Sequence, residues 1–211
     1  MWQRVIRQGT IPSRGRFGTG CPVMRRTATP SWTAFALRAT LVRSCTGCAP
    51  CPLQDGPTAG RHCFYRGGHP RVYGDQVQEA LIALADQVDV DVCKAIWSAA
   101  LRSAWSTAPV WFHGDVAVGN LLTAEGQLSG VIDFGTCGIG DPACDLVIAW
   151  TFLRGDERQS FREAVSLPDD AWARARGWAL WKALITMTEA ESSQYETQAD
   201  TLVELLEEPV G

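Results

Sequence analysis

The composition of the chain changes abruptly near residue 58, and this change limits where a packed domain can form. Arg, Pro, Gly, Ser, Thr and Cys supply 35 of the first 58 residues, which contain eight arginines, no lysine and one acidic residue. Residues 59–211 have eleven basic and 22 acidic side chains and an ordinary helix-forming composition. The sequence therefore predicts a poorly ordered basic segment over residues 1–58 and one folded body over residues 59–211.

The basic segment also has closely spaced cysteines, at Cys45, Cys48 and Cys51. Together with His62 and Cys63 they can complete a tetrahedral zinc site, but we expect unligated thiols in a poorly ordered segment instead. A nucleic-acid-binding tail is a further alternative, given the eight arginines. No aromatic platform is interleaved with them, so we expect no nucleic-acid partner.

Membrane insertion is not indicated anywhere in the sequence. The longest apolar stretch, Leu146 to Leu153, falls far short of the roughly 20 residues that a membrane helix needs. No apolar run follows Arg4 and Arg7, so a signal peptide is not expected either. We expect a cytoplasmic protein with no membrane partner.

Hydrophobic spacing after residue 74 predicts an α+β fold that is mostly helical. Asp75 is the candidate N-cap of the first helix, and Asp141 with Pro142 is typical of another helix start. The expected helices are Asp75–Val88, Asp91–Trp105, one beginning at Asp141, Asp156–Val165, Pro168–Thr188 and Glu189–Glu207. The expected strands are Val110–Phe112, Leu121–Leu122 and Leu128–Ile132, the last two forming a short hairpin through the turn at residues 125–127.

A polar loop precedes this hairpin and an acidic triplet follows it. The loop contains Asp115 and Asn120, and the triplet is Asp133-Phe134-Gly135. If the hairpin brings loop and triplet together, three oxygen donors converge. Magnesium prefers carboxylate and amide oxygens, so Asn120 and Asp133 suit the metal and Asp115 remains free to accept a proton. Phosphoryl transfer requires this division of roles.

At these residues the sequence resembles the aminoglycoside phosphotransferases and related small-molecule kinases, which share the protein-kinase fold. The matching motifs are His-Gly-Asp-x-x-x-x-Asn (113–120), Asp-Phe-Gly (133–135) and Gly-Asp-Pro-x-x-Asp-Leu (140–146), and the match extends from about Ala59 to the C-terminus. The resemblance implies a C-terminal kinase lobe whose hairpin supports the catalytic and metal-binding loops. It also implies an ATP-dependent transfer to the hydroxyl of a small molecule, with Mg²⁺ as cofactor and antibiotic resistance as a biological role.

The resemblance assigns roles to individual residues. It makes Asp115 the catalytic base and Asn120 and Asp133 the magnesium ligands. His113 packs beneath the loop, and Asp145 holds the loop's backbone amides. Gly135 in the metal-binding triplet and Asp141 as a helix cap have supporting roles.

The later helices are rich in acidic residues, which suit a cationic, aminoglycoside-like acceptor. The candidates are Asp156, Glu157, Glu189 and Glu191. An ordinary solvated face is the alternative. For Trp178 and Trp181 we expect core packing, with the lining of an acceptor pocket as the alternative. For Lys182 we expect a side chain that reaches water.

A kinase needs a second, N-terminal lobe that supplies a lysine to the nucleotide phosphates and a glutamate to pair with it. Residues 1–58 contain neither residue type. We expect that this nucleotide lobe is missing or aberrant, as a gene read out of frame or started at the wrong place would yield. The alternative function is a truncated remnant that binds ligand or metal without turnover.

Overall fold

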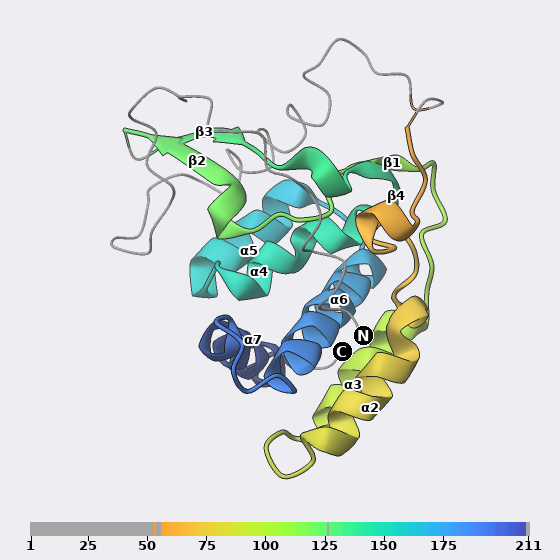
Figure 1. The fold of residues 1–211 in the computed structure, drawn as a ribbon. Coiled ribbons are helices and arrows are strands. Elements are labelled where there is room, and N and C mark those ends of the chain that lie inside the picture. The colour runs from red at the N-terminus through yellow and green to blue at the C-terminus, as the bar shows by residue number, and fades with distance from the viewer. Residues whose placement is uncertain (1–52, 54–55, 126, 210–211) are drawn as a thin grey trace, which may run out of the picture.

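The computed structural model describes Leu53, residues 56–125 and residues 127–209 (Figure 1). The predicted poorly ordered segment therefore lies almost wholly outside the described residues, as do Cys45, Cys48 and Cys51. The α-helices are α2 (Gly74–Ala83), α3 (Val90–Leu101), α4 (Ile148–Thr151), α5 (Gly155–Val165), α6 (Asp169–Met187) and α7 (Tyr195–Glu207). The strands are β1 (Val110–Phe112), β2 (Leu121–Ala124), β3 (Gln127–Val131) and β4 (Gly138–Gly140). The prediction of a mostly helical fold with small antiparallel sheets is confirmed.

Helix α6 lies at the centre of the molecule and is buried along most of its length (Figure 1). It packs against α2, α3 and α7, and against a 3₁₀ segment, η6 (Pro142–Val147). Trp178 and Trp181 of α6 are buried, as predicted for core residues. Burial around the whole helix explains why its sequence has apolar residues on every face. No helix in the described ranges has both the length and the apolar character needed to cross a bilayer.

The helix ends differ from the predicted ones in the first half of the fold. Helix α2 begins at Gly74 and ends at Ala83, and Asp75 lies in its first turn rather than at the N-cap, so that prediction is wrong. In α3 the capping residue is Asp89, whose carboxylate accepts the backbone N–H groups of residues 91 and 92. This helix ends at Leu101 rather than Trp105, because Ser103 bonds through its carbonyl and hydroxyl to other elements.

In the second half, the predicted cap at Asp141 is confirmed, since its carboxylate accepts the Ala143 N–H. The segment it starts is the 3₁₀ turn η6, however, and α4 follows only at Ile148. Helix α7 begins at Tyr195 rather than Glu189. The polar residues before it form turns, in which Ser192 N–H bonds to Glu189 O and Tyr195 N–H to Ser192 O.

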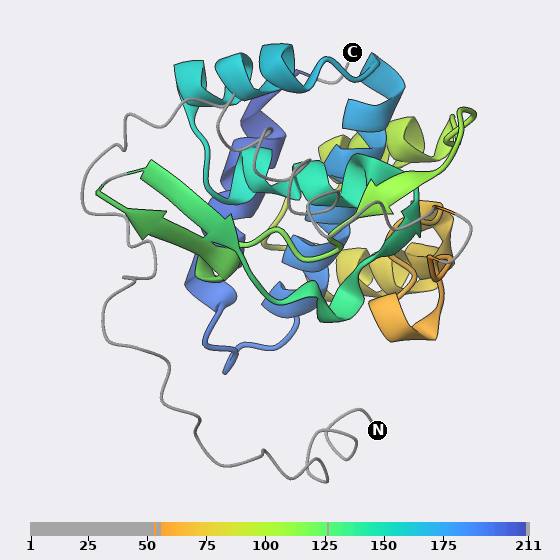
Figure 2. The same ribbon diagram turned by 90° about the horizontal axis from the view of Figure 1, so that it is seen from above.

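Two small antiparallel sheets lie on one side of the helices. The predicted hairpin is confirmed as β2 paired with β3, and seen from above it projects from the body away from β1 and β4 (Figure 2). The sequence did not indicate that β1 pairs with β4. Backbone also approaches β4 from residues 56–58, since Ile139 N–H bonds to Pro57 O at 2.9 Å. Only glycine fits at position 138, where a Cβ would lie 2.6 Å from Pro57 O.

Candidate active site

Asp145, in η6, holds the loop that begins at His113. Its carboxylate is buried and accepts the backbone N–H groups of His113 and Gly114, both at 2.7 Å. Burial raises the pKa of Asp145, and the two N–H donors oppose that shift because they favour the charged form. Asp145 thus makes the contact with the loop amides that the resemblance implies.

The His113 ring lies beneath the loop and is fully buried. Its Nδ1 accepts the Asp115 N–H at 3.2 Å, and its Nε2 lies 3.0 Å from the carbonyl of Ile132. These partners assign the neutral tautomer with the proton on Nε2, because the carbonyl can only accept. The ring also contacts Phe134, with centroids 4.5 Å apart. His113 therefore joins the loop to the segment that contains Asp133.

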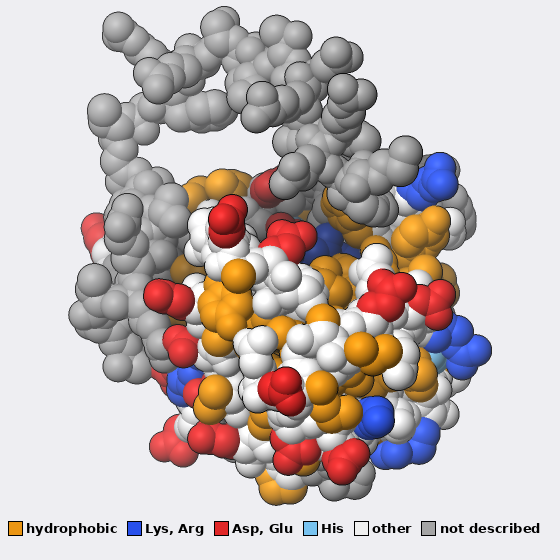
Figure 3. Space-filling view, turned by 60° about the horizontal axis from the view of Figure 1, so that its bottom comes forward, with side chains coloured by type: hydrophobic (Ala, Val, Ile, Leu, Met, Phe, Trp, Pro, Cys, Tyr) orange, Lys and Arg blue, Asp and Glu red, His pale blue; other side chains and the backbone are white. Residues whose placement is uncertain are grey.

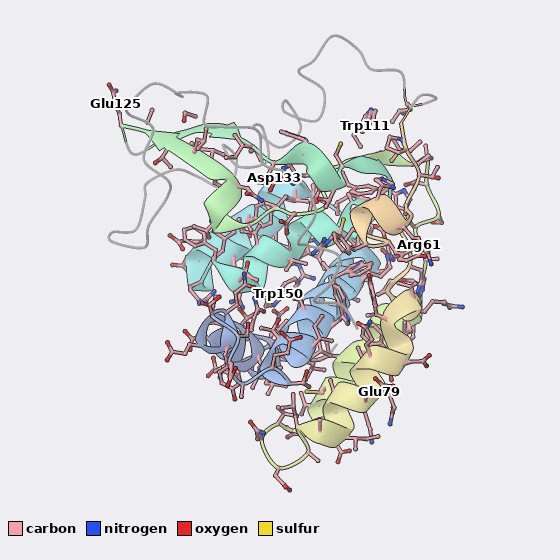
Figure 4. All side chains as sticks on the ribbon, in the orientation of Figure 1. Arg61, Glu79, Trp111, Glu125, Asp133 and Trp150 are labelled. Atoms are coloured by element: carbon pink, nitrogen blue, oxygen red, sulfur yellow. The ribbon has the colours of Figure 1, made fainter. Side chains whose placement is uncertain are left out.

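Asn120 and Asp133 lie at the same end of the β2–β3 hairpin. Asn120 directly precedes β2, where Leu121 pairs with Val131, and its carbonyl accepts the Ile132 N–H at 2.9 Å. Figure 4 shows Asp133 at the base of the hairpin and Glu125 at its tip. The hairpin therefore brings Asn120 beside the segment that holds Asp133.

Asp115 and Asn120 are in direct contact. The Asn120 side-chain Nδ2 donates to the Asp115 carbonyl at 2.8 Å and lies 3.5 Å from the Asp115 Oδ2. The loop is closed from the other side by Thr136, whose hydroxyl donates to the His113 carbonyl at 3.1 Å. Gly114 has a φ of +85°, and a Cβ there would lie 2.5 Å from the Thr136 carbonyl. This position therefore requires glycine.

The oxygen donors of the site suit a magnesium ion that is shared with phosphates. The contact with Asp115 uses the Asn120 amide nitrogen and leaves the amide oxygen available, and the Asp133 side chain is exposed. Over the described ranges, no three His, Cys, Asp or Glu side chains gather into a complete metal site. A carboxylate, an amide oxygen and waters are the ligands that Mg²⁺ uses when substrate phosphates complete its coordination.

A pocket of about 660 Å³ lies beside Asp115, between α2, α6 and the segment around Arg66. Arg66 belongs to the pocket lining and its Nη2 is 3.9 Å from the Asp115 Oδ1, so Asp115 lies next to the pocket although it is not part of the lining. The polar and charged residues of its lining are Arg66, Tyr73, Gln76, Glu79, Trp181, Lys182, Thr186, Thr188, Glu189, Ser192 and Gln194. The sequence did not indicate a role for Arg66, because no local pattern distinguishes it. For Lys182 it predicted a side chain that reaches water, whereas the structure places this residue in the pocket lining.

Of the four acidic residues expected near the acceptor, Glu189 lines this pocket. Asp156 and Glu157 lie in the first turn of α5, and Glu191 follows α6; none of the three is in the pocket lining. Acidic side chains are scattered over the face shown in Figure 3, with basic side chains between them. They form no single acidic patch on that face.

Asp141 is buried away from solvent, where it pairs with Arg174 of α6. The Arg174 Nε donates to the Asp141 Oδ2 at 2.6 Å. The other carboxylate oxygen makes the helix-cap contact, so Asp141 supports the segment leading to Asp145. The sequence did not indicate the arginine partner.

Comparison with known proteins places this geometry in a family. The sequence profile of the Phosphotransferase enzyme family matches residues 51–178, more than half of the chain. An aminoglycoside 3'-phosphotransferase of Escherichia coli is 47% identical over 45 residues, which are 21% of this chain and 17% of that protein.

Two similar solved structures are aminoglycoside phosphotransferases. The streptomycin–ATP complex of APH(2")-IIa has 15% identity and a TM-score of 0.46, over 84% of this chain and 62% of that one. The ADP-bound APH(2'')-Ib has 16% identity and a TM-score of 0.38, over 65% of this chain and 51% of that one. This chain spans less than two thirds of the length of each of these relatives. By the match of its sequence to the family profile, the chain belongs to the phosphotransferase enzyme family.

Proposed function

We propose that this protein transfers the γ-phosphoryl group of ATP to a hydroxyl group of a small molecule. One observation supports this function best: the Asn120 side-chain amide contacts Asp115. Asn120 precedes the β2–β3 hairpin, and Asp133 follows it. Membership of the phosphotransferase family supports the reaction class.

In this proposal Asp115 is the catalytic base. Its side chain is 47% exposed, so an acceptor can reach the carboxylate. Asp115 takes the hydroxyl proton as the acceptor oxygen bonds to the γ-phosphorus, and the bond from that phosphorus to the bridging oxygen of ADP breaks. Asn120 and Asp133 would hold a magnesium ion, which supplies neutralisation of the phosphate charge.

The acceptor in this proposal is a small molecule with a cationic group. Glu79 on α2 and Glu189 after α6 are exposed at the pocket beside Asp115 and suit an ammonium group. The 45-residue similarity to an aminoglycoside 3'-phosphotransferase favours the same class.

A second candidate function is binding without turnover, and the position of the lysines favours it. The chain has two lysines, Lys94 and Lys182, and both lie on α-helices. Neither is on a strand of the kind that presents a lysine to the α- and β-phosphates in kinases. In this second proposal the chain would bind a ligand or metal but would transfer phosphate slowly or not at all.

The test is an assay of the full chain with Mg·ATP and a panel of hydroxyl acceptors, in which ADP release and phosphorylated product are both measured. We expect Asp115→Asn to lower turnover by about 10²- to 10⁴-fold, because the proton acceptor is lost. Asp200→Asn, at an exposed position of α7, is the matched control and should retain activity. Turnover that survives Asp115→Asn contradicts the assignment of the base. Stabilisation by Mg·ATP with no product from any acceptor supports binding without turnover instead.

A further inference from the structure

Lys182 contributes an ammonium group to the lining of the pocket beside Asp115. The side chain projects from the central helix α6 and is half-buried. Among the residues that the structure describes, no carboxylate forms an ion pair with it. Burial lowers the pKa of Lys182, and the charge of Arg66 lowers it further, while Asp115 and Glu189 act in the opposite direction.

Arg66 adds a second positive charge to the pocket lining and acts on Lys182. Its side chain is 18% exposed, and its guanidinium lies 3.9 Å from Asp115 and 5.6 Å from the centre of the Phe64 ring. The distance to Asp115 exceeds that of a hydrogen bond, so the guanidinium N–H groups are not hydrogen-bonded to the Asp115 carboxylate. Two cations of the pocket lining, Arg66 and Lys182, thus lie near the exposed Asp115 carboxylate, and Glu189 also acts on Lys182.

The pocket lining also contains an aromatic pair and two exposed carboxylates. Tyr73 and Trp181 are stacked in its wall, with centroids 4.0 Å apart and ring planes 15° from parallel. Trp181 is fixed there by a 2.8 Å hydrogen bond from its indole N–H to the Gln76 side chain. The exposed carboxylates of Glu79, which projects from α2 in Figure 4, and Glu189 belong to the same pocket.

We infer that the acceptor is a zwitterion, whose carboxylate binds between Lys182 and Arg66 and whose ammonium group faces Glu79 and Glu189. This inference rests on the proposed function and narrows its substrate class. A partly desolvated ammonium without a partner is unfavourable, and a bound carboxylate relieves that cost through charge-assisted hydrogen bonds. A purely polycationic acceptor would instead place like charges against both cations, which disfavours it.

The test measures binding to the full chain by calorimetry without nucleotide, so that no turnover is needed. The probes are the dipeptide tyrosylserine, which has a hydroxyl, an ammonium and a carboxylate, its C-terminal amide, and the polycation gentamicin. We expect tyrosylserine to bind at least about tenfold more tightly than its amide, a difference of about 1.4 kcal/mol. Lys182→Met should remove this preference. Lys94→Met, at an exposed position of α3, is the matched control and should retain it.

A second measurement uses the unmodified protein and does not depend on the folding of a variant. The chain has only these two lysines, so acetylation of Lys182 can be compared with that of Lys94 by peptide mapping. We expect tyrosylserine, but not its amide, to protect Lys182 selectively.

Several results would overturn the inference: equal binding of the dipeptide and its amide, tighter binding of gentamicin, a preference that survives Lys182→Met, or no binding of tyrosylserine at millimolar concentration. Failure of phosphoryl transfer with the binding preference intact overturns the proposed function alone.

Discussion

The buried ion pair between Arg174 and Asp141 connects the central helix to the segment that leads to Asp145. The Arg174 side chain is 0% exposed and that of Asp141 is 5% exposed. Arg174 donates to Asp141 at 2.6 Å and to the Ser103 hydroxyl at 2.7 Å, and lies 3.2 Å from Asp170. Removal of one partner from such a pair leaves an uncompensated charge in the interior, which costs about 3–5 kcal/mol.

A double-mutant cycle tests how strongly this pair is coupled. Arg174→Met removes the guanidinium and leaves the Asp141 carboxylate unpaired. Asp141→Asn preserves the shape and the cap oxygen, but turns an amide N–H₂ toward the guanidinium donors. We expect each variant to lower the free energy of unfolding by about 3–5 kcal/mol. The free energy of unfolding of the double variant should fall by about 2–3 kcal/mol less than the sum of the losses in the two single variants, because neither charge remains to be compensated.

The assay is urea unfolding followed by tryptophan fluorescence, with linear extrapolation to water. The additive loss of about 6–10 kcal/mol would exceed or nearly exhaust the stability of an ordinary domain, so a folded double variant is itself informative. Arg102→Met combined with Asp200→Asn, two exposed positions, supplies the control cycle and should be additive. Additivity within about 0.5 kcal/mol in the Arg174 cycle would refute the reasoning, because it would mean that the pair is not coupled.

Two further predictions concern other buried groups. Asp145→Asn keeps one of the two acceptor oxygens and leaves one loop N–H unsatisfied, so we expect a loss of about 1–3 kcal/mol and a thermal midpoint lower by several degrees in calorimetry. An unchanged midpoint would contradict this role of the carboxylate. Burial raises the pKa of Cys93 to about 11, so the thiol is almost entirely protonated at pH 8 and its thiolate fraction grows as the pH rises toward that value. We expect iodoacetamide to label Cys93 only after unfolding, as measured by peptide mapping, and rapid labelling of the native protein would disprove it.

The sequence was most informative where the contacts are local. Asp115, Asn120 and Asp133 lie in one loop and at the two ends of one hairpin, so the spacing of residues and the strand pattern are enough to predict their proximity. The contact of Asp145 with the loop amides was implied only by the resemblance of residues 140–146 to the family's motif. The functional roles of these residues stay predictions until the variants are assayed.

The features that the sequence did not reveal depend on contacts between distant segments. Strand β4 contains two glycines in three residues and has no alternating pattern, so its pairing with β1 left no local signal. Lys182 resembles an ordinary lysine on an apolar helix, because nothing near it in the sequence shows that the charges of Arg66 and Asp115 act on it. The end of α3 depends likewise on partners of Ser103 that come from other elements.

The hairpin makes the positions of the proposed magnesium ligands, Asn120 and Asp133, independent of the number of residues between them. The pairing of Leu121 with Val131 fixes the distance between its two ends, while Glu125 lies at the opposite tip. Insertions or deletions at the tip therefore lengthen or shorten the strands without separating Asn120 from Asp133. A shift of even one residue in the strand register would instead turn side chains to the other face and move the two apart. We therefore expect changes of length to be compatible with this geometry at the turn but not at the base of the hairpin.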